Sequence, residues 1–152
     1  MTAVRSLARS VSAAALSGGL LCATAACGTD VRPESAAPPW QEPSSYTYTL
    51  TSSEGERALI GAFRVTVRDG KVTKARGLDS SARRMVRDLP DQVPTLGALL
   101  AELDQARRDK ADTAEAEYAA DGHPKRIFLD WDRNAVDDEA LYVISAYETA
   151  GG

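Results

Sequence analysis

The sequence predicts an α+β domain in which an antiparallel sheet carries one helix on a face, in the order β-β-β-α-β-β-β. Three observations lead to this prediction. Apolar and polar residues alternate in several short segments, which is typical of half-buried strands. Glycine-containing turns join two pairs of these segments into hairpins. One segment between the hairpins has apolar residues at helical spacing. We therefore expect two hairpin-containing halves of one sheet, with the helix packed on it.

The first predicted strand is the segment SYTYTLT. Tyr46, Tyr48 and Leu50 alternate with threonines, and tyrosine and threonine both favour strands. Trp40 lies shortly before this strand in a segment rich in proline and serine. Because large aromatic side chains are mostly buried, we expect Trp40 to mark the start of the fold by packing against the sheet.

The segment FRVTVRDGKVTKAR is the clearest hairpin in the chain. Its Asp-Gly pair at 69–70 provides the two positive-φ positions of a type I′ turn. With a two-residue loop, Val67 is expected to face Val72, and Val65 is expected to face Lys74. This register predicts a buried face interrupted by a lysine at its rim.

The segment SSARRMVRDLPDQVP is predicted to be irregular. Its arginines could form a small basic patch that binds a ligand, although such a run is more often simply solvated. The candidate binding residues are Arg83, Arg84 and Arg87.

The segment TLGALLAELDQARRDK is the predicted helix. Thr95 can cap its first turn through its side-chain oxygen. The apolar stripe is one face wide, so the helix should lie on the sheet. The stripe consists of Leu96, Leu99, Leu100, Leu103 and Ala106.

The segment TAEAEYAADGHPKRIFLDW is a second predicted hairpin, because two alternating runs flank a DGHP turn. Across its strands, Glu115 and Glu117 could face Lys125 or Arg126. His123, the only histidine, is expected to be a solvent-facing turn residue. The alternating residues of the two runs are Ala114, Ala116, Tyr118, Ile127, Leu129 and Trp131. The segment EALYVISAYE is the predicted last strand.

The N-terminal residues predict export. Two arginines and no acid precede a short apolar stretch, which is typical of a signal peptide. The stretch ends in TAAC, which resembles the lipobox at which a bacterial lipoprotein is diacylated on cysteine and cleaved. We expect a lipoprotein signal peptide at 1–26, a lipidated flexible tether at 27–42 that begins with Cys27, and the domain at 43–150. The alternative is an ordinary secretory peptide cleaved near Ala26.

The counts of charged residues and cysteines limit the classes of function that the chain can have. Without the signal peptide the chain has 16 basic and 22 acidic residues, a balance that repels nucleic acid and anionic lipid headgroups. Cys22 would leave with the signal peptide and Cys27 would be acylated, so the domain would contain neither a thiol nor a disulfide. We expect no cofactor and no binding of nucleic acid.

The acidic segment 130–139 offers a candidate calcium site. Asp130, Asp132 and Asp138 stand at three of the spacings of an EF-hand loop. However, Ala135 occupies the position where the sharp turn needs glycine, and Leu141 stands where a bidentate glutamate is needed. A weak calcium site formed by the three aspartates is an alternative to hydrated carboxylates that discourage sheet-edge pairing.

Several motifs are similar to those of a family of small bacterial lipoproteins classed as a domain of unknown function. Ala119 departs from the family pattern, where an aspartate follows the tyrosine. The resemblance covers most of residues 40–148 and implies lipid anchoring and an α+β fold, without implying a reaction. The matching residues are Tyr46 and Tyr48; Val67, Asp69, Gly70 and Val72; Tyr118; Gly122 and Pro124; Asp130; and Asp137, Asp138 and Glu139.

The residues thus predict a cell-envelope protein at the extracytoplasmic face of the membrane, held by a diacylglyceryl group on Cys27. We expect its domain to be a non-enzymatic module that binds an envelope protein or ligand, because no nucleophile–base pair and no metal-ligand cluster is evident. The alternative is an extracytoplasmic domain that binds calcium weakly through the 130–139 loop.

Overall fold

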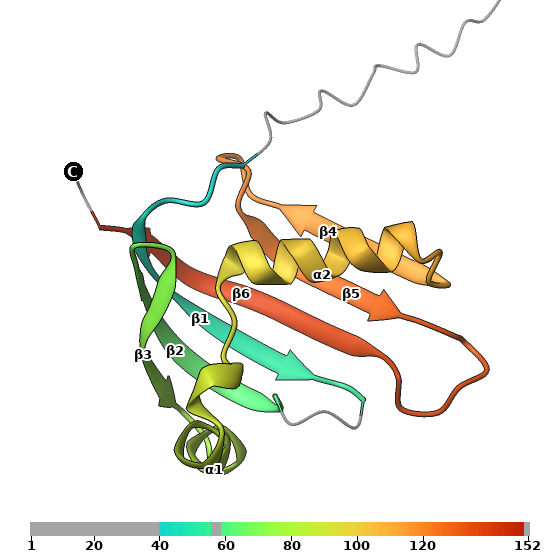
Figure 1. Ribbon diagram of the computed structural model, residues 1–152, viewed down its shortest axis with the longest axis horizontal. Helices are drawn as coiled ribbons and strands as arrows, with labels where there is room; N and C mark the ends of the chain where they lie inside the picture. Colours follow the sequence, from blue (N-terminus) through green and yellow to red (C-terminus); the bar gives the residue numbers. More distant parts are fainter. Residues whose placement is uncertain (1–39, 56–58, 151–152) are drawn as a thin grey trace, which may run out of the picture. The chain divides into compact units, whose positions relative to one another are not determined.

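The computed structural model describes residues 40–55 and 59–150. The predicted signal peptide at 1–26, the predicted lipidation site Cys27 and the predicted tether up to residue 39 lie outside the described residues. Within the described ranges, six strands form one antiparallel sheet, with two α-helices and a short 3₁₀ helix between the third and fourth strands (Figure 1). The α+β class and the antiparallel sheet are confirmed. The predicted element order is wrong, because a second helix precedes the expected one.

The sheet has the strand order β3-β2-β1-β6-β5-β4. Its two halves, each of three consecutive strands, join where β1 pairs with β6, so that β3 and β4 form the two edges. The strands are β1 (Ser45–Ser53), β2 (Gly61–Arg68), β3 (Lys71–Gly77), β4 (Thr113–Tyr118), β5 (Pro124–Asp130) and β6 (Ala140–Thr149).

The helix α2 (Leu96–Arg108) covers one face of the sheet, where it contacts β4 and β5 (Figure 1). Thr95 caps it as predicted, accepting a hydrogen bond from Ala98 N at 3.1 Å. Leu96, Leu99 and Leu103 are buried against the inward strand residues, so the predicted helical face is confirmed. No helix in the described part of the chain is long and apolar enough to cross a membrane.

The segment predicted to be irregular contains the helix α1 (Ser80–Asp88) and the 3₁₀ helix η1 (Pro90–Gln92). Asp79 caps α1, and the helix buries only Ala82 and Met85. These two buried residues lie three positions apart, and an apolar pattern this short does not indicate a helix in a segment with several arginines. The prediction therefore failed because the helix depends on its cap and on contact with β2 and β3.

The first hairpin has the predicted turn and one unexpected register shift. Asp69 and Gly70 both have positive φ, and Val67 pairs with Val72 as expected. A bulge follows, so that Val65 pairs with Ala75 and the expected pairing with Lys74 is wrong. Since a one-residue shift reverses the faces, the bulge places Ala75 on the buried side and Lys74 outside.

The strand β6 contains a second irregularity at Ala146, which has a φ of 47°. The pairing with β1 shifts between Ser145 and Glu148, where two intervening residues of β6 oppose one of β1. As a result, Tyr147 lies on the inner side of the sheet, where its ring contacts Tyr46 and Trp40. The expected packing of Trp40 against the sheet is confirmed.

Candidate functional site

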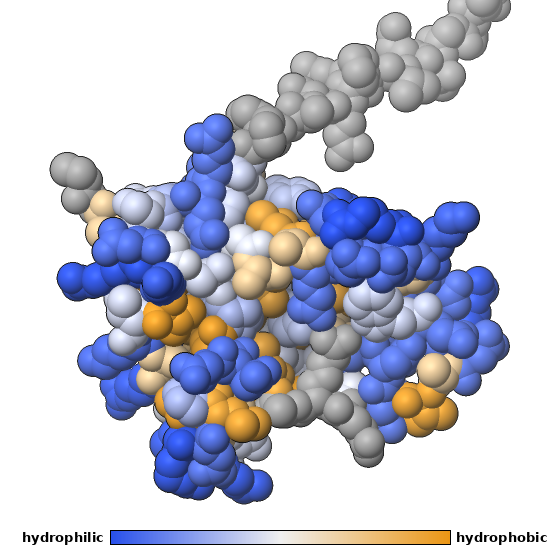
Figure 2. Space-filling model, viewed as in Figure 1, coloured by the Kyte–Doolittle hydropathy of each residue, from blue (hydrophilic) through white to orange (hydrophobic). Residues whose placement is uncertain are grey.

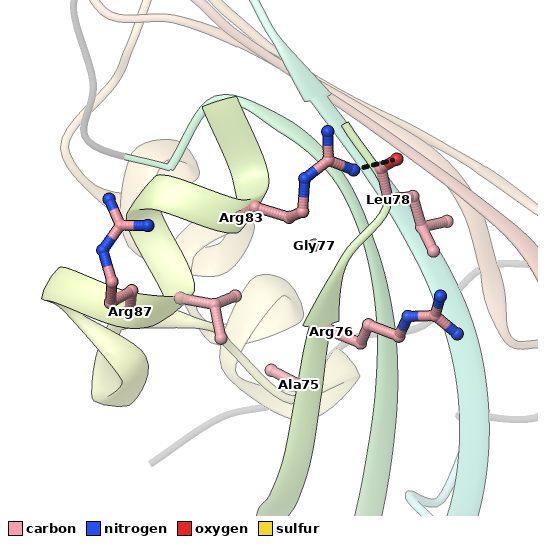
Figure 3. A pocket seen from close by; sticks show the side chains of 7 residues that line it. Ala75, Arg76, Gly77, Leu78, Arg83 and Arg87 are labelled. Atoms are coloured by element: carbon pink, nitrogen blue, oxygen red, sulfur yellow. Dashed lines mark hydrogen bonds between the residues drawn. The ribbon is translucent and has the colours of Figure 1, made fainter. Parts of the chain in front are cut away.

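A groove lies between the helix α1 and the edge strand β3 (Figure 3). Its volume is about 340 Å³. Two of the three predicted binding residues line it, whereas Arg84 does not, and Arg76 of β3 joins them. The lining residues are Ala75, Arg76, Gly77, Leu78, Arg83, Val86 and Arg87.

Asp79 holds α1 beside the sheet. One carboxylate oxygen accepts a hydrogen bond from Ala82 N at 2.8 Å, inside the first turn of the helix, and the other accepts one from Ala62 N at 2.6 Å, in β2. These hydrogen bonds, the larger contribution being from Ala82, hold the pKa of Asp79 below its ordinary value. The same side chain thus starts the helix and ties it to the neighbouring strand.

The helix approaches the strands closely because glycine occupies the contact points. A Cβ atom at Gly77 would lie 2.2 Å from the backbone nitrogen of Arg83. A Cβ atom at Gly61 would lie 2.7 Å from the Asp79 carboxylate. The backbone of α1 therefore packs directly on the ends of β2 and β3, which brings Arg83 and Arg87 of the helix to the same groove as Arg76 of the strand.

The arginines stand around the groove at separate positions. Arg83 donates a hydrogen bond to the carbonyl oxygen of Leu78 at 3.0 Å, and Arg87 pairs with its exposed neighbour Asp88 at 3.1 Å. The side chain of Arg76, which pairs with β2 through its backbone, has no hydrogen bond or ion pair among the described residues. Figure 3 shows the three guanidinium groups pointing in different directions, with Leu78 between Arg83 and Arg76. Such an arrangement suits a ligand with several anionic groups better than a single small anion.

Apolar surface accompanies these charges. Leu78 is 45% exposed, Leu89 just beyond α1 is 46% exposed, and Val86 is half-buried in the groove. Figure 2 shows apolar patches over the region where α1 meets β3, with strongly hydrophilic residues around them. The lining residues offer hydrogen-bond donors and apolar contacts, and none of them carries a nucleophile or a general base.

The acidic 130–139 loop is organised by its own hydrogen bonds. Asp138 accepts from Asp132 N at 2.8 Å, and Asp132 accepts from Asn134 N at 2.9 Å. Burial, followed by the charge of Asp138, raises the pKa of Asp130. Among the described residues, no three His, Cys, Asp or Glu side chains are arranged to hold a metal ion. The calcium site of Asp130, Asp132 and Asp138 stays a prediction that this geometry does not favour.

His123 is packed rather than solvent-facing, so the expectation from the sequence is wrong. Its side chain is only 15% exposed, and its ring stacks on Tyr147 with 4.1 Å between centroids. Its Nδ1 lies 2.5 Å from the Asp121 carboxylate. The bulge in β6 turns Tyr147 inward and so creates the stacking of His123 on Tyr147. No local pattern in the sequence predicts this bulge.

The sequence interpretation missed Arg76, Leu78 and Val86 as groove residues. The available signal was the run KVTKAR, which places three cations within six residues of the predicted hairpin. The expected charge pairing in the second hairpin is confirmed in one case, since Arg126 lies 3.8 Å from Glu117.

The fold and the groove define a small α+β domain with a cationic groove between an edge strand and a short helix. Comparison with family models matches residues 34–149 to a family of unknown function, DUF6174. The chain belongs to this family, which confirms the expectation of an uncharacterised domain family. No curated protein and no solved structure matched the chain.

Proposed function

We propose that the chain is a lipid-anchored cell-envelope protein whose domain binds an anionic ligand in the α1–β3 groove without catalysing a reaction. The observation that carries this proposal is the set of three arginines around an apolar floor. Arginine stays charged in proteins and donates up to five hydrogen bonds, which suits carboxylate and phosphate groups. Leu78 and Val86 supply contacts for apolar parts of the ligand.

The membrane anchor is the part of the proposal that rests on sequence alone. The TAAC motif supports diacylation of Cys27 after export, which would hold the domain at the extracytoplasmic face. We expect globomycin to cause accumulation of the unprocessed precursor, and mass spectrometry to find two acyl chains on Cys27. A mature protein that is unacylated and fractionates away from membranes would overturn this part.

Ligand binding is tested on the mature lipoprotein in nanodiscs of neutral phosphatidylcholine, with inorganic tripolyphosphate as the probe. Isothermal titration calorimetry should detect binding to the native protein. Since hydrogen bonds to charged groups contribute about 1.5–3 kcal/mol each, the Arg83→Gln/Arg87→Gln variant should raise Kd by about tenfold or more.

The matched control is Arg84→Gln, because Arg84 lies on the same helix but does not line the groove. It should leave Kd within about twofold of the native value, the range of surface changes away from a contact. Equal losses in both variants would show general charge attraction instead of a groove site. An absence of binding to the native protein would also contradict the proposal.

A further inference from the structure

The charges of the domain are separated between the two edges of its sheet. Residues 64–88, which contain most of β2 and all of β3 and α1, have eight basic and three acidic residues. Residues 112–139, which contain β4 and β5, have three basic and nine acidic residues. Because β3 and β4 are the opposite edges of the sheet, one edge region is basic and the other is acidic. The mild net negative charge of the chain is the sum of these two opposite charges and hides their separation.

The basic end places cations beside one another. Arg64 pairs with Arg76 across β2 and β3, and Arg68 pairs with Lys71. Like charges directly opposite on a sheet destabilise it. The charge of Arg64 is partly compensated by the carboxylate of Glu148, 3.5 Å away. Among the described residues, no acidic side chain forms an ion pair with the cations of β3. An anionic surface outside the protein would relieve this repulsion.

The tether enters the domain beside the turn that precedes β3, at the opposite end of this strand from the groove. Gly70 N, in the turn that precedes β3, donates a long hydrogen bond of 3.4 Å to the carbonyl oxygen of Ser44. Trp40, which packs on Tyr46, lies four residues before Ser44 in the chain. Twelve residues lie between Cys27 and Trp40, and the 13 steps from one to the other span at most about 45 Å. An anchor on Cys27 would therefore keep the basic end within reach of the membrane.

We propose that the basic edge, formed by Lys71, Lys74, Arg76, Arg83 and Arg87, docks on the anionic phospholipid headgroups of the membrane that holds the anchor. This inference rests on the proposed function and names the ligand of its groove as a phosphate headgroup. The separate positions of the guanidinium groups match a layer of headgroups, and exposed Leu78 reaches their apolar boundary. The acidic edge, which carries β4, faces away from the membrane.

The four lysines of the chain allow a test on the unmodified mature lipoprotein. Lys71 and Lys74 lie on the basic edge, whereas Lys110 and Lys125 lie elsewhere, and all four are exposed. The protein is inserted into preformed vesicles and acetylated with a membrane-impermeant amine reagent, and mass spectrometry gives the rate at each lysine. Vesicles of phosphatidylcholine alone are compared with vesicles that contain about one-third phosphatidylglycerol.

We expect Lys71 and Lys74 to react about fivefold more slowly on the anionic vesicles, because the headgroups cover them. Lys110 and Lys125 should react equally on both kinds of vesicle. Salt at about 0.5 M should remove the difference, since it screens exposed charges. The Arg76→Gln/Arg83→Gln variant should lose the protection, while Arg126→Gln, a matched change on β5, should keep it.

Equal rates at Lys71 and Lys74 on both kinds of vesicle would overturn the inference, as would equal protection of all four lysines. If the rates are equal but the Arg83→Gln/Arg87→Gln variant still loses tripolyphosphate binding, the proposed function stands and the lipid ligand is excluded. Protection of Lys71 and Lys74 by soluble polyglutamate but not by the vesicles would indicate an acidic protein partner and would likewise overturn the lipid assignment.

Discussion

Asp79 joins a helix to a strand 17 residues earlier in the chain, because its carboxylate accepts the N–H of Ala62 with 2.6 Å between Oδ2 and the nitrogen. The other oxygen caps the helix at Ala82. The helix α1 buries only two side chains, so this double contact contributes a large share of what holds it in place. The groove beside α1 therefore depends on one carboxylate.

Replacing Asp79 with alanine should lower the free energy of unfolding by about 1–2 kcal/mol, because the helix loses its cap and Ala62 N loses its acceptor. Chemical denaturation at pH 7 measures the loss. The Ser80→Ala change, at an exposed position one residue on, should stay within about 0.5 kcal/mol of the native protein. Equal losses in the two variants would show that the cap is not responsible.

The same comparison has a defined pH dependence. The pKa of Asp79 is lower in the folded state than its ordinary value, so its stabilisation is complete above the unfolded pKa, near pH 4, and is lost as the pH falls through the folded value. The difference in stability between the native protein and Asp79→Ala should therefore be constant from about pH 5 to 7 and shrink at lower pH. A difference that persists unchanged at pH 2 would contradict the ionised cap.

The Gly77→Ala variant should displace α1. The new Cβ would lie 2.2 Å from Arg83 N and 2.4 Å from the carbonyl carbon of Ala82, and both are backbone atoms that cannot turn aside. We expect a loss of about 3 kcal/mol or more, measured by denaturation, together with loss of tripolyphosphate binding.

Gly70→Ala is the control for this substitution. Gly70 has a φ of +69° but nothing within 4 Å of the added carbon, so only the backbone cost of about 1 kcal/mol applies. Its binding should equal that of the native protein. A smaller loss at Gly77 than at Gly70 would contradict the close approach of α1.

Replacing Asp130 with asparagine should raise the thermal midpoint at pH 7. Burial and then the charges of Asp138, Glu139 and Asp112 raise the pKa of Asp130, and its Oδ1 has no hydrogen-bond partner among the described residues. An acid with a raised folded pKa destabilises the fold increasingly as the pH rises from its unfolded pKa, near 4, to the folded value, so the gain should be absent below about pH 3. Calorimetry across this range checks the sign, and a lower midpoint at pH 7 would refute the interpretation.

Calcium should not change the thermal midpoint of the protein. Asp132 and Asp138 already accept backbone hydrogen bonds within their loop, and the described residues present no cluster of three ligands. Melting curves in about 2 mM calcium and in EDTA should coincide, because only a ligand that binds the folded state raises its stability. A rise of several degrees in calcium would instead establish the site of Asp130, Asp132 and Asp138.

The sequence alone determined the features that depend on neighbouring residues. The Asp-Gly pair at 69–70 specified its turn because both positions need positive φ. The alternation from Tyr46 to Leu50 and the helical spacing from Leu96 to Ala106 specified which side chains are buried. Each pattern repeats over several residues, and every repeat assigns its apolar residues to the same buried face of the strand or helix.

The tertiary structure decided what depends on residues far apart in the chain. The helix α1 forms where Asp79 meets Ala62, and the bulge between Thr66 and Val67 in the pairing of β2 with β3 sets which cations of β3 lie outside. The bulge near Ala146 buries His123 against Tyr147. Arg76 and Arg83 share a groove only because glycine allows the helix to rest on the strand. Such contacts depend on strand register and close packing, which local propensity does not encode.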